Sequence, residues 1–140
     1  MFAWSRGWEH WYRRALPAYW IFLFCGTHFP KPLLPGRLPH EDKLAHFLAF
    51  AVLAFLLWRC AESLRRPLSG RFVWLALVVL GGYAAIDEYL QRFVNRSVTL
   101  SDFLANLGGI VAVLLVLELR RRRTQAPGVA PSAAGPRSAA

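Results

Sequence analysis

The sequence predicts an all-α membrane protein that crosses the bilayer four times, with both termini in the cytoplasm. Hydrophobic residues make up 56 % of its 140 residues, which is high for a small soluble domain. These residues are grouped in blocks instead of alternating with polar residues, and arginines lie between the blocks. The four blocks are 16–29, 44–58, 72–86 and 103–117.

Each block is shorter than the stretch of about 20 apolar residues that usually spans a bilayer. The polar residues beside the blocks can supply the missing turn. The third block, for example, reaches spanning length when its helix continues through Gln91. We therefore expect spans over about 15–29, 43–60, 72–92 and 100–119.

The positions of the Lys and Arg residues predict the orientation of the chain. If the chain starts inside and crosses four times, twelve of its 17 Lys and Arg residues lie on the inner side. Cytoplasmic loops of membrane proteins carry this excess. Because the basic residues lie between apolar blocks, the net charge of +9 does not indicate a nucleic-acid-binding protein.

The ends of the chain differ from the transmembrane domain at 15–119. Residues 1–14 are aromatic and basic, and Trp4, Trp8 and Trp11 share one face if this segment is helical. Two interpretations stay open for it: a helix in the membrane interface, or an aromatic anchor without a helix. Residues 120–140 begin with four arginines and continue as a tail rich in Ala and Pro that we expect to be disordered.

Helix starts and cysteines complete the outline of the fold. Pro17 is expected in the first turn of the first span, and Asp42 is a candidate N-cap of the second. Thr99 or Ser101 can cap the fourth. The two cysteines, Cys25 and Cys60, fall near opposite ends of their helices, so we expect free thiols.

Polar residues gather at one membrane level in this topology, the outer end of the second, third and fourth helices. Tyr83, Asp87 and Gln91 lie four residues apart and share a face of the third helix. Ionisable groups at this depth cost a few kcal/mol each unless they face the bundle and find partners. We therefore predict a polar cluster, in which Arg96 and Lys43 offset the carboxylates. Its members are His46, Asp87, Glu88, Gln91, Arg96, Asp102 and Asn106.

Small residues are expected to let these helices approach closely. They are Gly81, Gly82, Gly108 and Gly109. A simpler interpretation of the polar residues also stays open, in which they are helix ends just above the membrane. Asp102 would then interact with the helix dipole, and Glu88 with Arg92 would form an ordinary i, i+4 pair.

One motif in this region resembles a known family. The pattern Asp87-Glu88-x-x-Gln91-x-Phe93, Arg96, Asp102-x3-Asn106-x-x-Gly109, preceded by Asp42-Lys43-x-x-His46-Phe47, is similar to that of the VanZ-like family. These are small bacterial integral membrane proteins, named after a member associated with low-level teicoplanin resistance. The resemblance covers about residues 18–117. It implies a multi-pass protein of the bacterial cytoplasmic membrane with a role in the cell envelope and antibiotic resistance, and it implies no particular reaction.

Three functions are compatible with these residues. The first is a non-enzymatic protein whose polar cluster binds an envelope lipid, a cell-wall headgroup or a partner protein, without a cofactor or resident metal. The second is a hydrolase or transferase in which His46 and the carboxylates act as acid and base or hold a hard metal ion. The third is a small oligomeric transporter. The lipid bilayer is an expected partner, no nucleic acid is expected, and no role is assigned to His10, His28 or His40.

Overall fold

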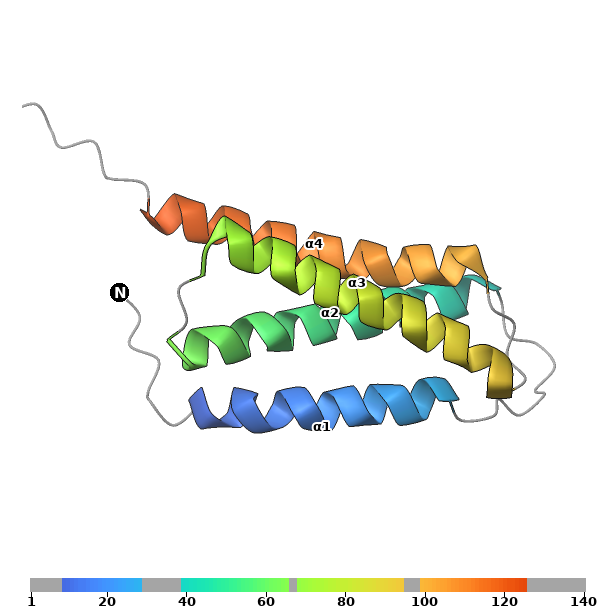
Figure 1. The fold of residues 1–140 in the computed structure, drawn as a ribbon. Helices are drawn as coiled ribbons and strands as arrows, with labels where there is room; N and C mark the ends of the chain where they lie inside the picture. The colour runs from blue at the N-terminus through green and yellow to red at the C-terminus, as the bar shows by residue number, and fades with distance from the viewer. Residues whose placement is uncertain (1–8, 29–38, 66–67, 95–98, 126–140) are drawn as a thin grey trace, which may run out of the picture.

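The computed structural model describes residues 9–28, 39–65, 68–94 and 99–125, and within them the protein is entirely helical. The predicted all-α class is thus confirmed. The helices run lengthwise beside one another, so the end of α1, the start of α2, the end of α3 and the start of α4 lie at one end of the bundle (Figure 1). The elements are α1 (Glu9–His28), α2 (Pro39–Ser63), α3 (Gly70–Gln91), a 3-10 turn (Arg92–Val94) and α4 (Leu100–Gln125).

Three of the helices are long and apolar enough to cross a membrane. These segments are Asp42–Ser63, Gly70–Val94 and Leu100–Gln125. The first helix, α1, is not among them, because the polar residues of its first two turns lower its hydropathy. The fourth span and the orientation of the termini therefore stay predictions.

The surface of the bundle suits an apolar solvent. Large apolar side chains such as Phe22, Trp74 and Val78 point outward and are mostly exposed. Every helix contributes buried apolar side chains to the interior, among them Leu23, Phe50, Leu80 and Ile110. Soluble proteins rarely expose so many large apolar side chains, and contact with lipid accounts for them.

Two helices begin earlier than the sequence indicated. Because α1 begins at Glu9, Pro17 lies inside the helix and not in its first turn. Residues 9–14 continue into α1, and Arg13 donates hydrogen bonds to the side chain and carbonyl of Ser63 in α2, which holds this early turn in place. Residues 1–8 and the tail from residue 126 lie outside the described residues.

The second helix starts at Pro39, so Asp42 is not its N-cap. Proline is well suited to a first helical turn, because its missing N–H would have no partner there. The fourth helix does have one of the expected caps. Its Asp102 N–H donates to the hydroxyl of Thr99, the residue before the helix, at 3.2 Å.

The helices α2 and α4 are in close backbone contact at Gly109. A Cβ atom on Gly109 would overlap the carbonyl oxygen of Phe47 and lie 3.1 Å from the amide nitrogen of Ala51. The other glycines are less constrained. A Cβ on Gly108 would make an ordinary contact with the ring of Phe47 at 3.5 Å, and one on Gly82 would meet nothing within 4 Å. The backbones of α2 and α4 can therefore approach this closely only because residue 109 has no side chain.

We expect Gly109→Ala to destabilise the protein by about 1–3 kcal/mol, the usual cost of inserting a methyl group into a packed core. The added Cβ must push α4 away from the α2 backbone. The free energy of unfolding in mixed micelles, titrated with SDS, measures the effect. Gly82→Ala is the matched control, since its Cβ enters open space and alanine is the better helix former by about 1 kcal/mol. Equal stabilities of the two variants would contradict the close contact.

The turn after α2 contains a strained residue. Arg65 has a φ of 53°, in the left-handed region that favours glycine. We expect Arg65→Gly to raise the free energy of unfolding by about 0.5–1 kcal/mol, because the Cβ that penalises this conformation is removed. Arg65→Ala, which removes the charge but keeps the Cβ, should give no such gain in the same SDS titration.

Candidate functional site

Polar side chains that the sequence places at one membrane level lie together at one end of the bundle. This is the end at which α1 and α3 finish and α2 and α4 begin (Figure 1). The buried members are His46, Asp87, Glu88, Gln91, Asp102 and Asn106. The seventh predicted member, Arg96, lies outside the described residues. The buried side chains form two neighbouring groups.

The first group surrounds Asp87 and joins α3 to α1. Asp87 is fully buried. Its Oδ1 accepts hydrogen bonds from the hydroxyls of Thr27 at 2.9 Å and Tyr83 at 3.3 Å, and its Oδ2 accepts one from Gln91 Nε2 at 3.0 Å. The Asp87 carboxylate is therefore bonded through both oxygens, which meets the requirement for keeping a polar group in an apolar environment.

The imidazole of His28 lies beside this group, although the sequence analysis assigned it no role. Its Nδ1 is 3.7 Å from Asp87 Oδ1, and its ring stacks on Phe24 with centroids 4.1 Å apart. The positions of Thr27 and His28 at the end of the first apolar block could have indicated their membrane level. Nothing in the local sequence indicates that they face Asp87, because that contact is made between helices.

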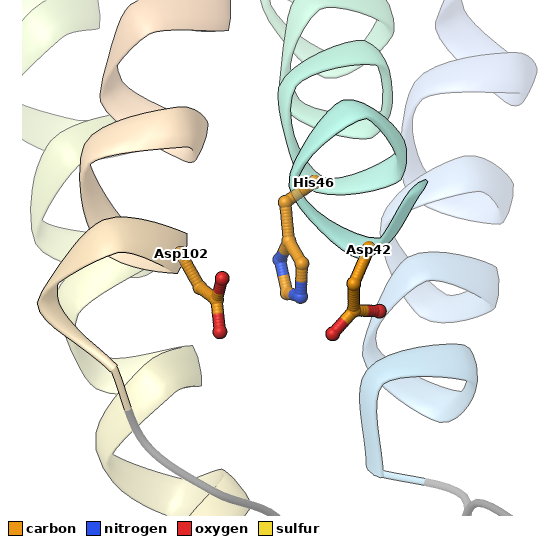
Figure 2. A group of neighbouring side chains, drawn as sticks. All are labelled: Asp42, His46 and Asp102. Carbon is orange, nitrogen blue, oxygen red and sulfur yellow. The ribbon is translucent and has the colours of Figure 1, made fainter. Parts of the chain in front are cut away.

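The second group contains Asp42 and His46 from α2 and Asp102 from α4. Asp42 and His46 are one helical turn apart on the same face, and Asp102 faces them from the neighbouring helix (Figure 2). Each side chain offers a ligand atom, and these atoms all lie within 4.8 Å of one another. Asp42 was expected to be a helix cap and was left out of the predicted polar cluster, although its i, i+4 spacing from His46 was a usable signal.

Asn106 and Glu88 complete the surroundings of this second group. The Asn106 side-chain oxygen lies 3.1 Å from His46 Nδ1. Glu88 Oε1 accepts the backbone N–H of Thr99 at 3.1 Å, and Glu88 is close enough to His46, Asp87 and Asp102 to interact with each electrostatically. Glu88 therefore connects the two groups.

Two buried polar atoms in this second group have no hydrogen-bond partner. They are Glu88 Oε2 and Asn106 Nδ2. Within the described ranges, neither Glu88 nor Asp102 forms an ion pair with Lys or Arg. Lys43, which was expected to offset these carboxylates, pairs with neither of them. Burying polar atoms without partners is costly, so this arrangement is suited to receiving a bound group.

The donor types also limit what can bind. Two aspartates and one histidine are a ligand set that divalent first-row metal ions use in proteins. The same oxygens could accept hydrogen bonds from an ammonium group or from sugar hydroxyls. No cysteine takes part, since Cys25 and Cys60 are both free and belong to neither group.

We expect Thr27 and Asp87 to be coupled in stability. In a double-mutant cycle with Thr27→Val and Asp87→Leu, their interaction energy should be about 0.6–1.7 kcal/mol, the range for hydrogen bonds between membrane helices. SDS-induced unfolding measures each corner of the cycle. Thr124→Val is the control, because the Thr124 hydroxyl donates only to the carbonyl of Arg121 in its own helix, at 2.8 Å. A cycle of Thr124→Val with Asp87→Leu should give an interaction energy near zero. An interaction energy near zero for Thr27 and Asp87 would contradict the hydrogen bond between them.

Comparison with known proteins supports the resemblance in the sequence. A profile of the family described as VanZ/LLP1 matches residues 4–121. The chain is also 31 % identical over 84 residues to the "Uncharacterized membrane protein YwnJ" of Bacillus subtilis (strain 168). That alignment covers 60 % of this chain and 54 % of the relative, so the chain spans about half the length of the curated relative it matches. No solved structure matches the chain.

The family match includes every residue of both polar groups and the close contact at Gly109. It also agrees with the long apolar helices and with the large apolar side chains exposed on the surface of the bundle. Because the match covers most of its length, the chain belongs to the VanZ/LLP1 family of membrane proteins.

Proposed function

We propose that the protein binds the polar headgroup of an envelope lipid or lipid-linked cell-wall precursor at the outer face of the bacterial cytoplasmic membrane. One observation carries the proposal: Glu88 Oε2 and Asn106 Nδ2 are buried at the same end of the bundle without partners. A headgroup that donates a hydrogen bond to the Glu88 carboxylate and accepts one from the Asn106 amide gives both atoms a partner.

The orientation in this proposal follows from the basic residues. Twelve of 17 Lys and Arg residues fall on the side away from the two polar groups when all four helices cross the membrane. Two contacts support α1 as the fourth span. Arg13 bonds to Ser63 at one end of the bundle, and Thr27 bonds to Asp87 at the other. With 20 residues, α1 is about 30 Å long, which is enough to cross the hydrocarbon core.

The chemistry of the ligand follows from the donor set. Carboxylates that face a membrane surface suit ammonium groups and sugar hydroxyls, which are found on envelope lipids and cell-wall precursors. Lys43, at the same end of the bundle, suits the phosphate of such a molecule, and the sequence predicts Arg96 as a second basic residue at this membrane level. The family name connects this proposal with teicoplanin, because a glycopeptide acts on cell-wall precursors at the outer surface.

Susceptibility to teicoplanin and vancomycin tests the functional proposal. We expect the wild-type chain to raise the teicoplanin concentration that inhibits a sensitive bacterium, and Glu88→Gln to abolish the increase at equal membrane abundance. The substitution removes the charge and keeps the acceptor of the Thr99 N–H. Glu62→Gln is the matched control and should protect like the wild type. It makes the same change in α2, at the end of the bundle away from Glu88. If Glu88→Gln still protects, the charge of this carboxylate is not needed for the function. If the wild type does not protect, the protein has no link to resistance.

Fusions test the topology. We expect alkaline phosphatase fused after Gln125 to be inactive and green fluorescent protein at the same position to fluoresce, because the C-terminus is cytoplasmic in this proposal. The same reporters placed after His28 should give the opposite result if α1 crosses the membrane. Inactive phosphatase after His28 together with active phosphatase after Gln125 would mean that α1 stays on the cytoplasmic side, because the three crossings by α2, α3 and α4 then place Gln125 outside.

An enzyme is the second candidate function. The observation that favours it is the group of Asp42, His46 and Asp102, whose ligand atoms lie within 4.8 Å of one another. An imidazole among carboxylates can move protons, so a hydrolase or transferase acting on the bound headgroup is chemically feasible. Release of product from a labelled lipid-linked precursor, abolished in His46→Gln, would separate this function from binding alone.

A further inference from the structure

We propose that Asp42, His46 and Asp102 form a binding site for a divalent first-row transition metal ion, for which Zn²⁺ is the probe. The proposal concerns the metal ion itself and does not depend on headgroup binding. It rests on the placement of the three ligands, on the hydrogen bond of the histidine, and on the buried carboxylate of Glu88.

The placement of the three ligands fits one ion. Asp42 and His46 project from the same face of α2, and Asp102 projects toward them from α4 (Figure 2). Zinc binds such nitrogen and oxygen atoms at about 2.0–2.2 Å, so ligands of one ion lie roughly 3.5 Å apart. The ligand atoms lie within 4.8 Å of one another. Small rotations of the aspartate side chains close that difference.

The hydrogen bond to Asn106 prepares His46 for a metal. The Asn106 oxygen can only accept, so Nδ1 of His46 carries the proton in this 3.1 Å bond. The lone pair of the neutral ring is then on Nε2, which is the atom that remains to bind an ion. Histidines that ligate metals usually donate their other ring N–H in this way, which fixes the tautomer and the ring orientation.

Glu88 supplies the observation that is independent of the three ligands. It approaches from α3, it is 4 % exposed, and its Oε2 has no partner in the described residues. Its electrostatic neighbours include both His46 and Asp102. The negative charges of Glu88 and Asp102 repel each other beside the buried imidazole, and a divalent cation offsets that repulsion. Glu88 can complete the site as a fourth ligand or as a hydrogen-bond acceptor for a bound water.

A close contact between α2 and α4 lies next to the site. Asp102, Asn106 and Gly109 follow one another at i, i+4 and i+7 on the face of α4 that meets α2. At Gly109 this face contacts the carbonyl of Phe47, the residue after His46. The helix contact thus fixes the separation between the ligands of α2 and the ligand of α4. Three protein ligands also leave coordination positions open for an oxygen atom of another molecule.

The experiment uses the full chain purified in detergent without a polyhistidine tag and stripped with a chelator. We expect Zn²⁺ titration by calorimetry to give one site per chain, and Co²⁺ to give a visible absorption spectrum typical of nitrogen and oxygen ligands. Asp102→Asn should weaken Zn²⁺ binding by at least about 100-fold. Asn106→Leu, which removes only the acceptor for His46, should weaken it by about 10–100-fold.

Glu62→Gln is the matched control, because it removes a carboxylate from α2 at the end far from His46. It should bind Zn²⁺ like the wild type. Unchanged affinity in Asp102→Asn, or a folded wild type that binds no Zn²⁺, would overturn the proposal. If Asp102→Asn does not fold, the Co²⁺ spectrum of the wild type still decides: a spectrum identical to that of free aqueous Co²⁺ rejects the site. Metal binding without glycopeptide protection would exclude the resistance link and keep the metal site.

Discussion

The contact between α2 and α4 at Gly109 determines the positions of most other elements. Without a side chain at this residue, the α4 backbone can reach the carbonyl of Phe47. Asn106 and Asp102 lie about one and two turns earlier on the same face of α4, so the contact brings them to His46 on α2. The third helix joins this pair through Glu88, which accepts the N–H of Thr99 just before α4. A shift of α4 would therefore disturb packing and the polar groups together.

Polar side chains occur at both ends of the bundle, but they are partnered differently. At the end predicted to be cytoplasmic, Glu118 accepts hydrogen bonds from Arg121 and Arg122, and Glu62 accepts bonds from Trp58 and Arg59. Those carboxylates are neutralised within the protein. At the other end, Glu88 Oε2 and Asn106 Nδ2 have no partner among the described residues. This difference between the two ends supports the proposed binding site, because buried polar atoms in proteins usually have partners.

The sequence could predict which residues share a membrane level, because that level depends only on block length and helical rise. The helical class and the polar ends of the second, third and fourth helices follow from this one-dimensional reasoning. It could not predict which side chains meet. The bonds of Thr27 to Asp87 and the approach of Asp42 to Asp102 depend on how each helix is rotated against its neighbour. The helix starts at Glu9 and Pro39 were also missed, since Pro17 and Asp42 were each treated as boundary signals.

The adjacent carboxylates of Asp87 and Glu88 have different neighbours because they point about 100° apart around α3. Asp87 faces α1, where Thr27 donates to its Oδ1, and Tyr83 and Gln91 of α3 itself donate to Oδ1 and Oδ2. Glu88 faces the pair of α2 and α4, where one of its oxygens is bonded and the other is not. The first carboxylate thus has the surroundings of a structural residue that attaches α1. The second keeps one oxygen without a hydrogen-bond partner, as the proposed binding site needs. Two adjacent positions of α3 therefore contact different neighbours, and substitutions at Asp87 and Glu88 should report separately on the attachment of α1 and on the proposed binding site.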